Sequence, residues 1–259
     1  MNVRRWPLDA EPVLRRGLIA TNGGGSYVAS MAKAIIVGGY GPGISSAVAE
    51  KFGREGFSVA LVARNAERLA AGVKALEAKG IKAAAFPADL GDPAAVRELV
   101  GKVRAALGPV SVLHWNPYPS EAGDLLASDV AALHRVFDVA ITGLVMAIQE
   151  SLPDLKREKG AVLVTNGGFA FVDPKVDAYG VQASSMGISI ANAAKHKMVG
   201  LLSERLKSEG VYVGEVMVMG TVKGTAWDTG KGPTIEPSTI ANKFWELYKE
   251  RGHVRGQVS

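Results

Sequence analysis

The feature that most constrains the fold of this chain is a series of short runs that are apolar at every position. Strand runs of this kind are buried on both faces, which is typical of a parallel sheet covered by helices. Longer segments with helical spacing separate the runs, and several of them end at a glycine. We predict strands over residues 34–37, 59–62, 83–86, 110–113, 161–164, 211–219 and 254–258, and helices over 44–55, 66–79, 93–107, 129–156 (broken near Pro153), 184–208 and 238–251.

This alternation predicts a single doubly wound α/β domain of the Rossmann type, with a parallel sheet of about seven strands. Right-handed strand–helix–strand units place helices on both faces of such a sheet. Ligands then bind at the carboxyl ends of the strands, near the point where the strand order reverses. Residues 31–259 contain no linker that would divide them and no internal repeat, so we expect one domain over this range.

Residues 1–30 differ from the rest of the chain. Arginines alternate there with short apolar groups, and three consecutive glycines follow at Gly23–Gly25. Such a glycine run carries too large an entropy cost for the interior of a helix or strand. No apolar stretch reaches the length of a signal-peptide core. We therefore expect a flexible tail ahead of a domain that begins at Met31.

Composition excludes several classes of function. The 259 residues include no cysteine, which excludes disulfides, cysteine-ligated metal sites and a cysteine nucleophile, and which fits a cytoplasmic protein. The net charge of +5 is spread along the chain rather than gathered in a basic stripe, so no nucleic-acid partner is expected. Because no window of about 18 residues lacks charged and polar breaks, we expect no membrane span.

A glycine-rich turn follows the first expected strand and opens the first expected helix. Gly39 permits a tight turn, and Gly43 allows the backbone to approach a pyrophosphate. The amides that begin the next helix then face the phosphates, aided by the helix dipole. The expected dinucleotide-binding residues of this turn are Gly39, Tyr40, Gly41, Gly43 and Ile44.

The end of the second strand indicates which dinucleotide is bound. An acidic residue about 20 positions after the last glycine would bind the ribose 2′-hydroxyl of NAD, but Ala63 stands there and Arg64 follows. An arginine binds a 2′-phosphate through parallel hydrogen bonds. NADP is therefore favoured over NAD, with a solvated surface charge as the alternative for Arg64. Asp89 and Leu90, after the third strand, are placed to meet the adenine, with loop capping as the alternative for Asp89.

These residues resemble the short-chain dehydrogenase/reductase family over residues 31 to about 225. The resemblance rests on the glycine turn, on Ala63-Arg64-Asn65, on Asp89-Leu90 and on the order of the elements. It implies an NAD(P)-dependent oxidoreductase with a small-molecule substrate and Asn65 as a further cofactor residue. It also implies a homodimer or homotetramer built through the two long helices. Ser45 stands where the family has its last glycine.

The catalytic half of the chain departs from the family pattern. The family carries Asn-Asn-Ala-Gly after the fourth strand, and only Asn116 matches it here. We expect Asn116 to hold the strands near the cofactor. The family asparagine of the long helix falls at Ala140, and the family serine after the fifth strand falls at Asn166 or Gly167.

The Tyr-x-x-x-Lys pair of the family is also missing. Its tyrosine transfers the proton that accompanies hydride transfer, and its lysine lowers the tyrosine pKa and holds the nicotinamide ribose. Tyr179 is followed four residues later by Ala183, whereas Lys195 is preceded at that spacing by Ala191. The helical pattern favours alignment on Lys195. The chain thus resembles a divergent subgroup that keeps a glycine-proline-glycine turn and lacks the pair.

Three side chains are our candidates for the chemistry. Lys195 is placed to hold the nicotinamide ribose, or else is a surface lysine lying along apolar residues. Tyr179 is expected in a loop, where it would either close over the site as a proton donor or serve in packing. Asn166, with Thr165, ends the fifth strand and would either polarise a substrate carbonyl or cap a loop. His114 is more typical of a buried core histidine.

The loop after the sixth strand completes the expected site. Gly220 begins this loop, and the resemblance places Thr225 against the nicotinamide carboxamide. The glycines and prolines of residues 221–237 are typical of a mobile lid over the substrate. Ser184 and Ser185 precede the helix of Lys195 and are expected to cap it.

Two functions compete at this point. The first is an NADP(H)-dependent oxidoreductase that acts on an unidentified carbonyl or alcohol with a non-standard proton donor. General acid catalysis contributes about 10²–10⁴-fold, so its weakening need not abolish turnover. The second is a catalytically inactive dinucleotide-binding sensor or scaffold that has kept the fold. Other chemistry, such as isomerisation, is a third alternative because the fold alone does not select a reaction.

Overall fold

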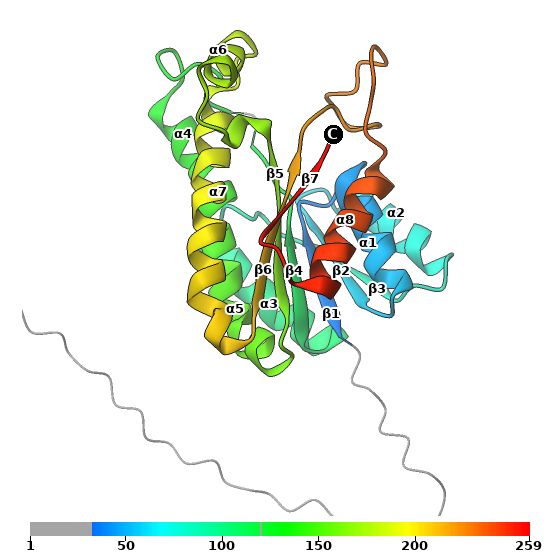
Figure 1. The fold of residues 1–259 in the computed structure, drawn as a ribbon. Helices are drawn as coiled ribbons and strands as arrows, with labels where there is room; N and C mark the ends of the chain where they lie inside the picture. The colour runs from blue at the N-terminus through cyan, green and yellow to red at the C-terminus, as the bar shows by residue number, and fades with distance from the viewer. Residues whose placement is uncertain (1–32, 120) are drawn as a thin grey trace, which may run out of the picture. The chain divides into compact units, whose positions relative to one another are not determined.

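A computed structural model describes residues 33–119 and 121–259. Seven strands form one parallel sheet in the order β3-β2-β1-β4-β5-β6-β7 (Figure 1). The expected doubly wound sheet is confirmed, and its order reverses between β1 and β4. The tail expected over residues 1–30 lies outside the described residues. The strands are β1 (Ala34–Gly38), β2 (Ser58–Ala63), β3 (Ala83–Pro87), β4 (Val110–Trp115), β5 (Ala161–Gly167), β6 (Tyr212–Val218) and β7 (Arg255–Val258).

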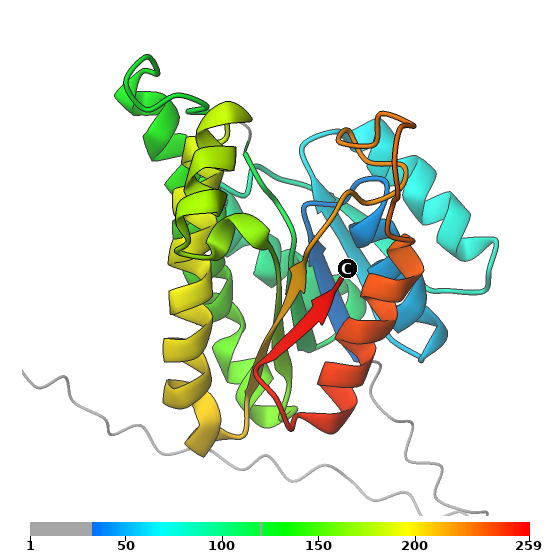
Figure 2. The same cartoon turned by 45° about the horizontal axis from the view of Figure 1, so that its top comes forward.

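Helices cover both faces of the sheet (Figures 1 and 2). α3, α5 and α7 pack on one face, and α1, α2 and α8 pack on the other. The helices are α1 (Ile44–Arg54), α2 (Ala66–Glu77), α3 (Pro93–Leu107), α4 (Val130–Phe137), α5 (Gly143–Arg157), α6 (Pro174–Gln182), α7 (Met186–Leu206) and α8 (Pro237–Glu250), with a π-helical turn η1 (Asp138–Thr142) and the 3-10 turns η2 (Gly168–Ala170) and η3 (Lys207–Glu209).

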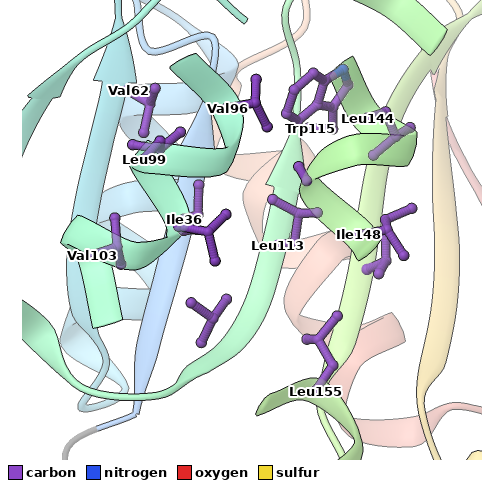
Figure 3. Packing of buried hydrophobic residues seen from close by; sticks show 14 of the residues in the cluster. Ile36, Val62, Val96, Leu99, Val103, Leu113, Trp115, Leu144, Ile148 and Leu155 are labelled. Atoms are coloured by element: carbon purple, nitrogen blue, oxygen red, sulfur yellow. The ribbon is translucent and has the colours of Figure 1, made fainter. Parts of the chain in front are cut away.

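The core explains why the strand runs are apolar at every position. Ile36 points into a cluster with Leu99 and Leu144, from the helices of one face (Figure 3). Its neighbour Ile35 points into a second cluster, which contains Phe52 and other residues from the opposite face. Because full burial of one such side chain contributes about 1.5–3 kcal/mol, both faces of the inner strands stabilise the sheet.

The long helical segment expected over 129–156 is correct in extent, but its expected break at Pro153 is wrong. Pro153 lies inside α5, where tertiary burial outweighs the cost of an internal proline, about 3 kcal/mol. The irregularity is instead η1, immediately before Gly143. A side chain at Gly143 would collide with the carbonyl oxygen of Leu90, so the helix approaches the turn after β3 very closely there.

The helical run Val130–Arg157 is long and apolar enough, by length and composition, to cross a membrane. From the sequence we expected no segment that could span a membrane, and by length and composition this helical run does not meet that expectation. In the fold, the run packs on the sheet with Leu144, Ile148 and Leu155 buried. A core helix that covers a sheet passes the same test, so the run is weak evidence for a span.

Candidate functional site

The glycine turn lies between β1 and α1, beside the reversal of strand order. Gly39 has a φ of 76°, and a Cβ there would lie 2.5 Å from the backbone nitrogen of Pro117. Gly43 has a φ of 86°, and a Cβ there would lie 2.6 Å from Cγ2 of Thr225. Both positions require glycine, because left-handed backbone and close neighbours exclude a side chain. The loops that follow β4 and β6 thus contact this turn closely, at Pro117 and at Thr225.

Ser45 links the glycine turn to the end of β4. Its Oγ donates to the carbonyl oxygen of Gly39 at 2.8 Å and accepts from Nδ2 of Asn116 at 2.7 Å. The backbone amide of Asn116 donates to the carbonyl oxygen of Gly38 at 3.0 Å. Asn116 therefore lies against the turn, as the sequence indicates. Ser45, which the resemblance aligns with the last glycine of the family turn, is the bridging residue.

The amino terminus of α1 can receive an anion. Among residues 33–119 and 121–259, no side chain caps the helix at Gly43, and its first turn holds no acidic residue. Ile44, the first helical residue, packs its side chain against the core rather than outward. Unpaired amides at a helix start attract phosphate oxygens, so the chain's own geometry fits the pyrophosphate of a dinucleotide.

Tyr40 and Gly41 have different surroundings within the turn. The amide of Tyr40 donates to the carbonyl oxygen of Val62 at 2.8 Å. Its ring lies against Gly72 of α2, where a Cβ would come within 2.5 Å of the hydroxyl, and burial raises the pKa of Tyr40. Tyr40 thus packs on α2. At Gly41 a Cβ would meet only Nη1 of Arg68, 4.0 Å away, so the backbone is open to a ligand.

Two arginines lie after β2. Arg64 is exposed, and Asn65 caps α2 by accepting the amide hydrogen of Arg68 at 2.7 Å. The side chain of Asn65 is thus occupied by the helix. Arg68 reaches toward Gly41, and sequence reasoning missed it. The signal was a second basic residue shortly after Arg64, in the first turn of α2.

Two aspartates in the turn after β3, Asp89 and Asp92, have different roles. Oδ1 of Asp89 accepts the amide hydrogen of Gly91 at 2.9 Å, which closes the turn. Asp92, not Asp89, caps α3 by accepting the amide hydrogen of Ala94 at 2.9 Å. Leu90 is 5% exposed. One carboxylate oxygen of Asp89 is therefore occupied by the turn.

The end of β5 holds a buried polar cluster. Nδ2 of Asn166 donates to Oε1 of Glu215 at 2.6 Å and to the carbonyl oxygen of Asn192 at 2.9 Å. Its Oδ1 accepts the amide hydrogen of Gly167 at 3.0 Å. The amide group of Asn166 thus faces inward, toward α7 and β6. This arrangement uses both of its N–H groups within the protein, so a substrate carbonyl would have to displace one of these bonds.

His114 is fully buried on β4. Its Nε2 lies 3.2 Å from Oγ1 of Thr165, and burial lowers the pKa of His114 to about 3. Its ring lies edge-on to Phe244 of α8. His114 is therefore a neutral core residue at physiological pH, as its position in an apolar strand suggested.

Lys195 is buried, not on the surface. Its Nζ donates a hydrogen bond to the carbonyl oxygen of Thr165 at 3.3 Å, and the side chain is buried. Burial lowers the pKa of Lys195 to about 8, against the opposing effect of Glu215. One helical turn earlier on α7 lies Ala191, which is buried. The alignment on Lys195 made from the sequence predicts the family tyrosine at this position. The structure thus places a lysine of low pKa at the carboxyl end of β5.

Tyr179 lies in α6, so its expected loop position is wrong. Asp173 caps this helix by accepting the amide hydrogen of Lys175, and Pro174 opens it. The Tyr179 side chain is 60% exposed and stacks on Phe169, with ring centroids 5.7 Å apart. No hydrogen bond among the described residues joins Tyr179 to another part of the site. The overlooked signal was an N-cap aspartate directly before Pro174, a pair that is typical of a helix start.

The expected cap of α7 also differs from the structure. Ser185 occupies the N-cap position, but its Oγ donates to the carbonyl oxygen of Ala183 at 3.0 Å rather than accepting a helix amide. Ser184 precedes it with a φ of 48°. The left-handed turn at Ser184 reorients the cap, so the expected capping bond is absent from this helix start.

The post-β6 loop, residues 221–237, begins after Gly220 and makes contacts both within itself and with the loop after β4. Val222 and Ile235 pair, and Nε1 of Trp227 donates to the hydroxyl of Tyr118 at 3.1 Å. A hollow of about 440 Å³ lies at the base of the loop, lined in part by Met219, Gly220, Thr221, Ile235, Glu236 and Thr239. The loop after β4 and the loop after β6 thus meet beside the glycine turn.

The comparisons with known proteins agree with this geometry. The sequence model described as short chain dehydrogenase matches residues 33–225. Meso-2,3-butanediol dehydrogenase of Serratia marcescens is 31% identical over 133 residues, which cover 51% of this chain and 52% of that protein. An uncharacterised oxidoreductase of Staphylococcus aureus is 24% identical over 86% of this chain and 93% of its own length. The chain spans about half the length of the first curated relatives it matches.

Solved structures share the fold. A short chain dehydrogenase from Burkholderia cenocepacia in complex with NADP has a TM-score of 0.78 at 23% identity, covering 88% of this chain and 97% of that one. L-sorbose reductase from Gluconobacter frateurii, complexed with NADPH and L-sorbose, has a TM-score of 0.75 at 19% identity with the same coverage. Since the family match spans well over half of the chain, this protein belongs to the short-chain dehydrogenase family.

Proposed function

We propose that this protein is an NADP(H)-dependent oxidoreductase that interconverts a carbonyl compound and an alcohol by hydride transfer. The observation that carries the proposal is the glycine turn, held by Ser45 and Asn116, with Arg64 and Arg68 beside it. The open amino terminus of α1 would bind the pyrophosphate. The NADP and NADPH bound to structural relatives support the same cofactor.

The two arginines favour the phosphorylated dinucleotide. A guanidinium binds a phosphate through two parallel, charge-assisted hydrogen bonds. Arg64 is exposed at the end of β2, and Arg68 lies on the first turn of α2 beside Gly41. No acidic residue follows β2 directly to favour the free 2′-hydroxyl of NAD.

Lys195 is the residue to which we assign proton transfer. The cofactor supplies the hydride, and the alcohol oxygen formed from a carbonyl needs one proton. The Lys195 ammonium would hold the nicotinamide ribose and donate that proton. Its pKa of about 8 makes it a stronger acid than a lysine in water. We give Asn166 a structural role, because its amide already bonds Glu215 and Asn192. Tyr179, exposed on α6, is the second candidate donor.

Cofactor binding tests the first half of the proposal. We expect tryptophan fluorescence titration to show NADPH binding at least about tenfold tighter than NADH, as charge-assisted bonds to phosphate require. Arg64→Glu should weaken NADPH binding by a similar factor and leave NADH binding nearly unchanged. Arg205→Glu, an exposed arginine at the far end of α7, is the control. Absence of binding to either dinucleotide would refute the proposal.

Turnover distinguishes the oxidoreductase from its rival. A dinucleotide-binding sensor or scaffold is favoured by one observation, the methyl group of Ala191 where the family has its tyrosine. NADPH oxidation with a panel of ketones and aldehydes, abolished by Lys195→Met and retained in Tyr179→Phe, supports the enzyme and its assigned donor. Tight NADPH binding without turnover across the panel supports the sensor.

The assembly and location of the protein are further proposals. α7 exposes Ile190 (38%) and Leu201 (60%), apolar residues that a subunit contact would bury. We propose a homodimer or homotetramer through the long helices, in the cytoplasm. A monomeric mass by light scattering at micromolar concentration would contradict the oligomer.

A further inference from the structure

Glu215 is a carboxylate with no exposure to solvent in the middle of β6. It lies on the same face of the strand as Val213, which packs in the cluster that contains residues of α7. Burying an unpaired carboxylate costs several kcal/mol. The Glu215 carboxylate therefore needs hydrogen-bond and ion-pair partners from neighbouring elements.

Three elements supply those partners. Oε1 of Glu215 accepts from Nδ2 of Asn166 on β5 at 2.6 Å. Oε2 lies 2.8 Å from Nδ1 of His196 on α7 and 3.3 Å from Nε of Arg255 on β7. Arg255 also donates to the carbonyl oxygen of His196 at 3.2 Å. One carboxylate thus joins two strands and a helix beneath the carboxyl end of the sheet.

Two residues of the site depend on this carboxylate. Asn166 is held with its amide turned inward, because its remaining N–H and its oxygen bond Asn192 and Gly167. Lys195 immediately precedes His196 on α7 and lies on the carbonyl oxygen of Thr165. The charge of Glu215 raises the pKa of Lys195 against the effect of burial.

Other ionisable groups surround the same helix. His114 of β4 reaches the Thr165 side chain and is neutral through burial. Asp138 of η1 and Arg255 of β7 lie on elements near α7. Burial lowers the pKa of Lys195, and among these charged groups Glu215 is the one that acts on it, by raising it.

We propose that Glu215 is a positioning residue of the active site: its carboxylate turns Asn166 inward at the end of β5 and holds Lys195 as a cation on Thr165. The inference rests on the proposed function, in which Lys195 holds the nicotinamide ribose. An apolar side chain at this position of β6 could neither accept the hydrogen bond of Asn166 nor stabilise the cation of Lys195.

A double-mutant cycle with NADPH tests the coupling. Glu215→Gln keeps the shape and the acceptor for Asn166 but removes the charge. At pH 8 we expect NADPH to bind about tenfold more weakly, as expected for loss of a charged hydrogen-bond donor. In a Lys195→Met background the same change should have little further effect, because coupled residues are not additive. Glu150→Gln, which removes a surface carboxylate paired with Arg97, is the control. Additive losses would overturn the proposal.

A ligand-free measurement separates this inference from the proposed function. Lysines labelled with ¹³C at Cε are titrated by NMR, and the Lys195 signal is assigned from its loss in Lys195→Met. We expect a midpoint near pH 8 in the natural protein, a lower midpoint in Glu215→Gln, and no change in Glu150→Gln. An unchanged midpoint in Glu215→Gln overturns the inference, whether or not NADPH binds.

A second variant covers the case in which Glu215→Gln does not fold. Glu215→Asp keeps the charge, so the Lys195 midpoint should stay near that of the natural protein. The shorter side chain withdraws from Asn166, which should weaken NADPH binding only modestly. A Lys195 midpoint that falls in Glu215→Asp despite the retained charge would overturn the electrostatic role.

Discussion

Replacing Ser45 by alanine tests how the glycine turn is held. Ser45 is 1% exposed, and its Oγ makes two hydrogen bonds, to the carbonyl oxygen of Gly39 and from Nδ2 of Asn116. Alanine fits the helix and removes only the hydroxyl. The change therefore isolates the link between the first and fourth strands at the dinucleotide site.

The two bonds set the expected magnitude. Each contributes about 0.5–1.5 kcal/mol, and their loss leaves the Gly39 carbonyl and one Asn116 N–H without partners at a buried position. Alanine recovers a few tenths of a kcal/mol in helix propensity. We expect Ser45→Ala to lower the free energy of unfolding by about 2 kcal/mol. For a domain of this size the Tm falls by about 4–8 °C.

Urea denaturation followed by circular dichroism measures the change. The neighbouring Ser46→Ala is the control, because Ser46 makes one local bond, to the carbonyl oxygen of Gly43 at 2.9 Å. Its effect should stay within about 0.5 kcal/mol. Ser45→Gly, which installs the residue of the family pattern, should lose more than alanine, since glycine disfavours the helix. A loss below about 0.5 kcal/mol in Ser45→Ala would refute the reasoning.

Three further results are expected. Gly143→Ala should destabilise the protein by about 2–3 kcal/mol through a backbone collision, whereas Gly101→Ala, with nothing within 4 Å, should stabilise it by about 0.5–1 kcal/mol in urea denaturation; equal effects would contradict this. His114 takes up a proton near pH 6.5 in the unfolded chain but only near pH 3 in the folded protein. The free energy of unfolding should therefore fall as the pH drops from 6.5 to 3, by up to about 1.4 kcal/mol per pH unit. His114→Gln should flatten this decline in urea denaturation, and an unchanged pH dependence in this variant would contradict the role of His114. Trp227→Phe and Tyr118→Phe should each speed hydrogen exchange in the post-β6 loop by breaking one bond; exchange that stays slow would show that this bond does not hold the loop.

The turn at which the site is proposed was predictable because it is local in the chain. The glycine turn, Arg64 and the family match follow from residues close in sequence, and Asn116 stands in a recognisable motif. Tyr179 was misplaced because the cap and proline that start α6 were overlooked. Arg68 was missed because its relation to Gly41 spans a strand and a helix start.

The sequence by itself determined the parallel sheet, because uninterrupted apolar strands and glycine-terminated helices are patterns of one segment at a time. Only the tertiary structure decided what each polar residue does. Glu215 reads as an ordinary acidic residue in the sequence, yet its contacts come from segments up to 49 positions away. Lys195 likewise becomes a weak base only through burial. Hydrogen bonds and desolvation depend on distances that folding creates, which no local pattern of residue types contains.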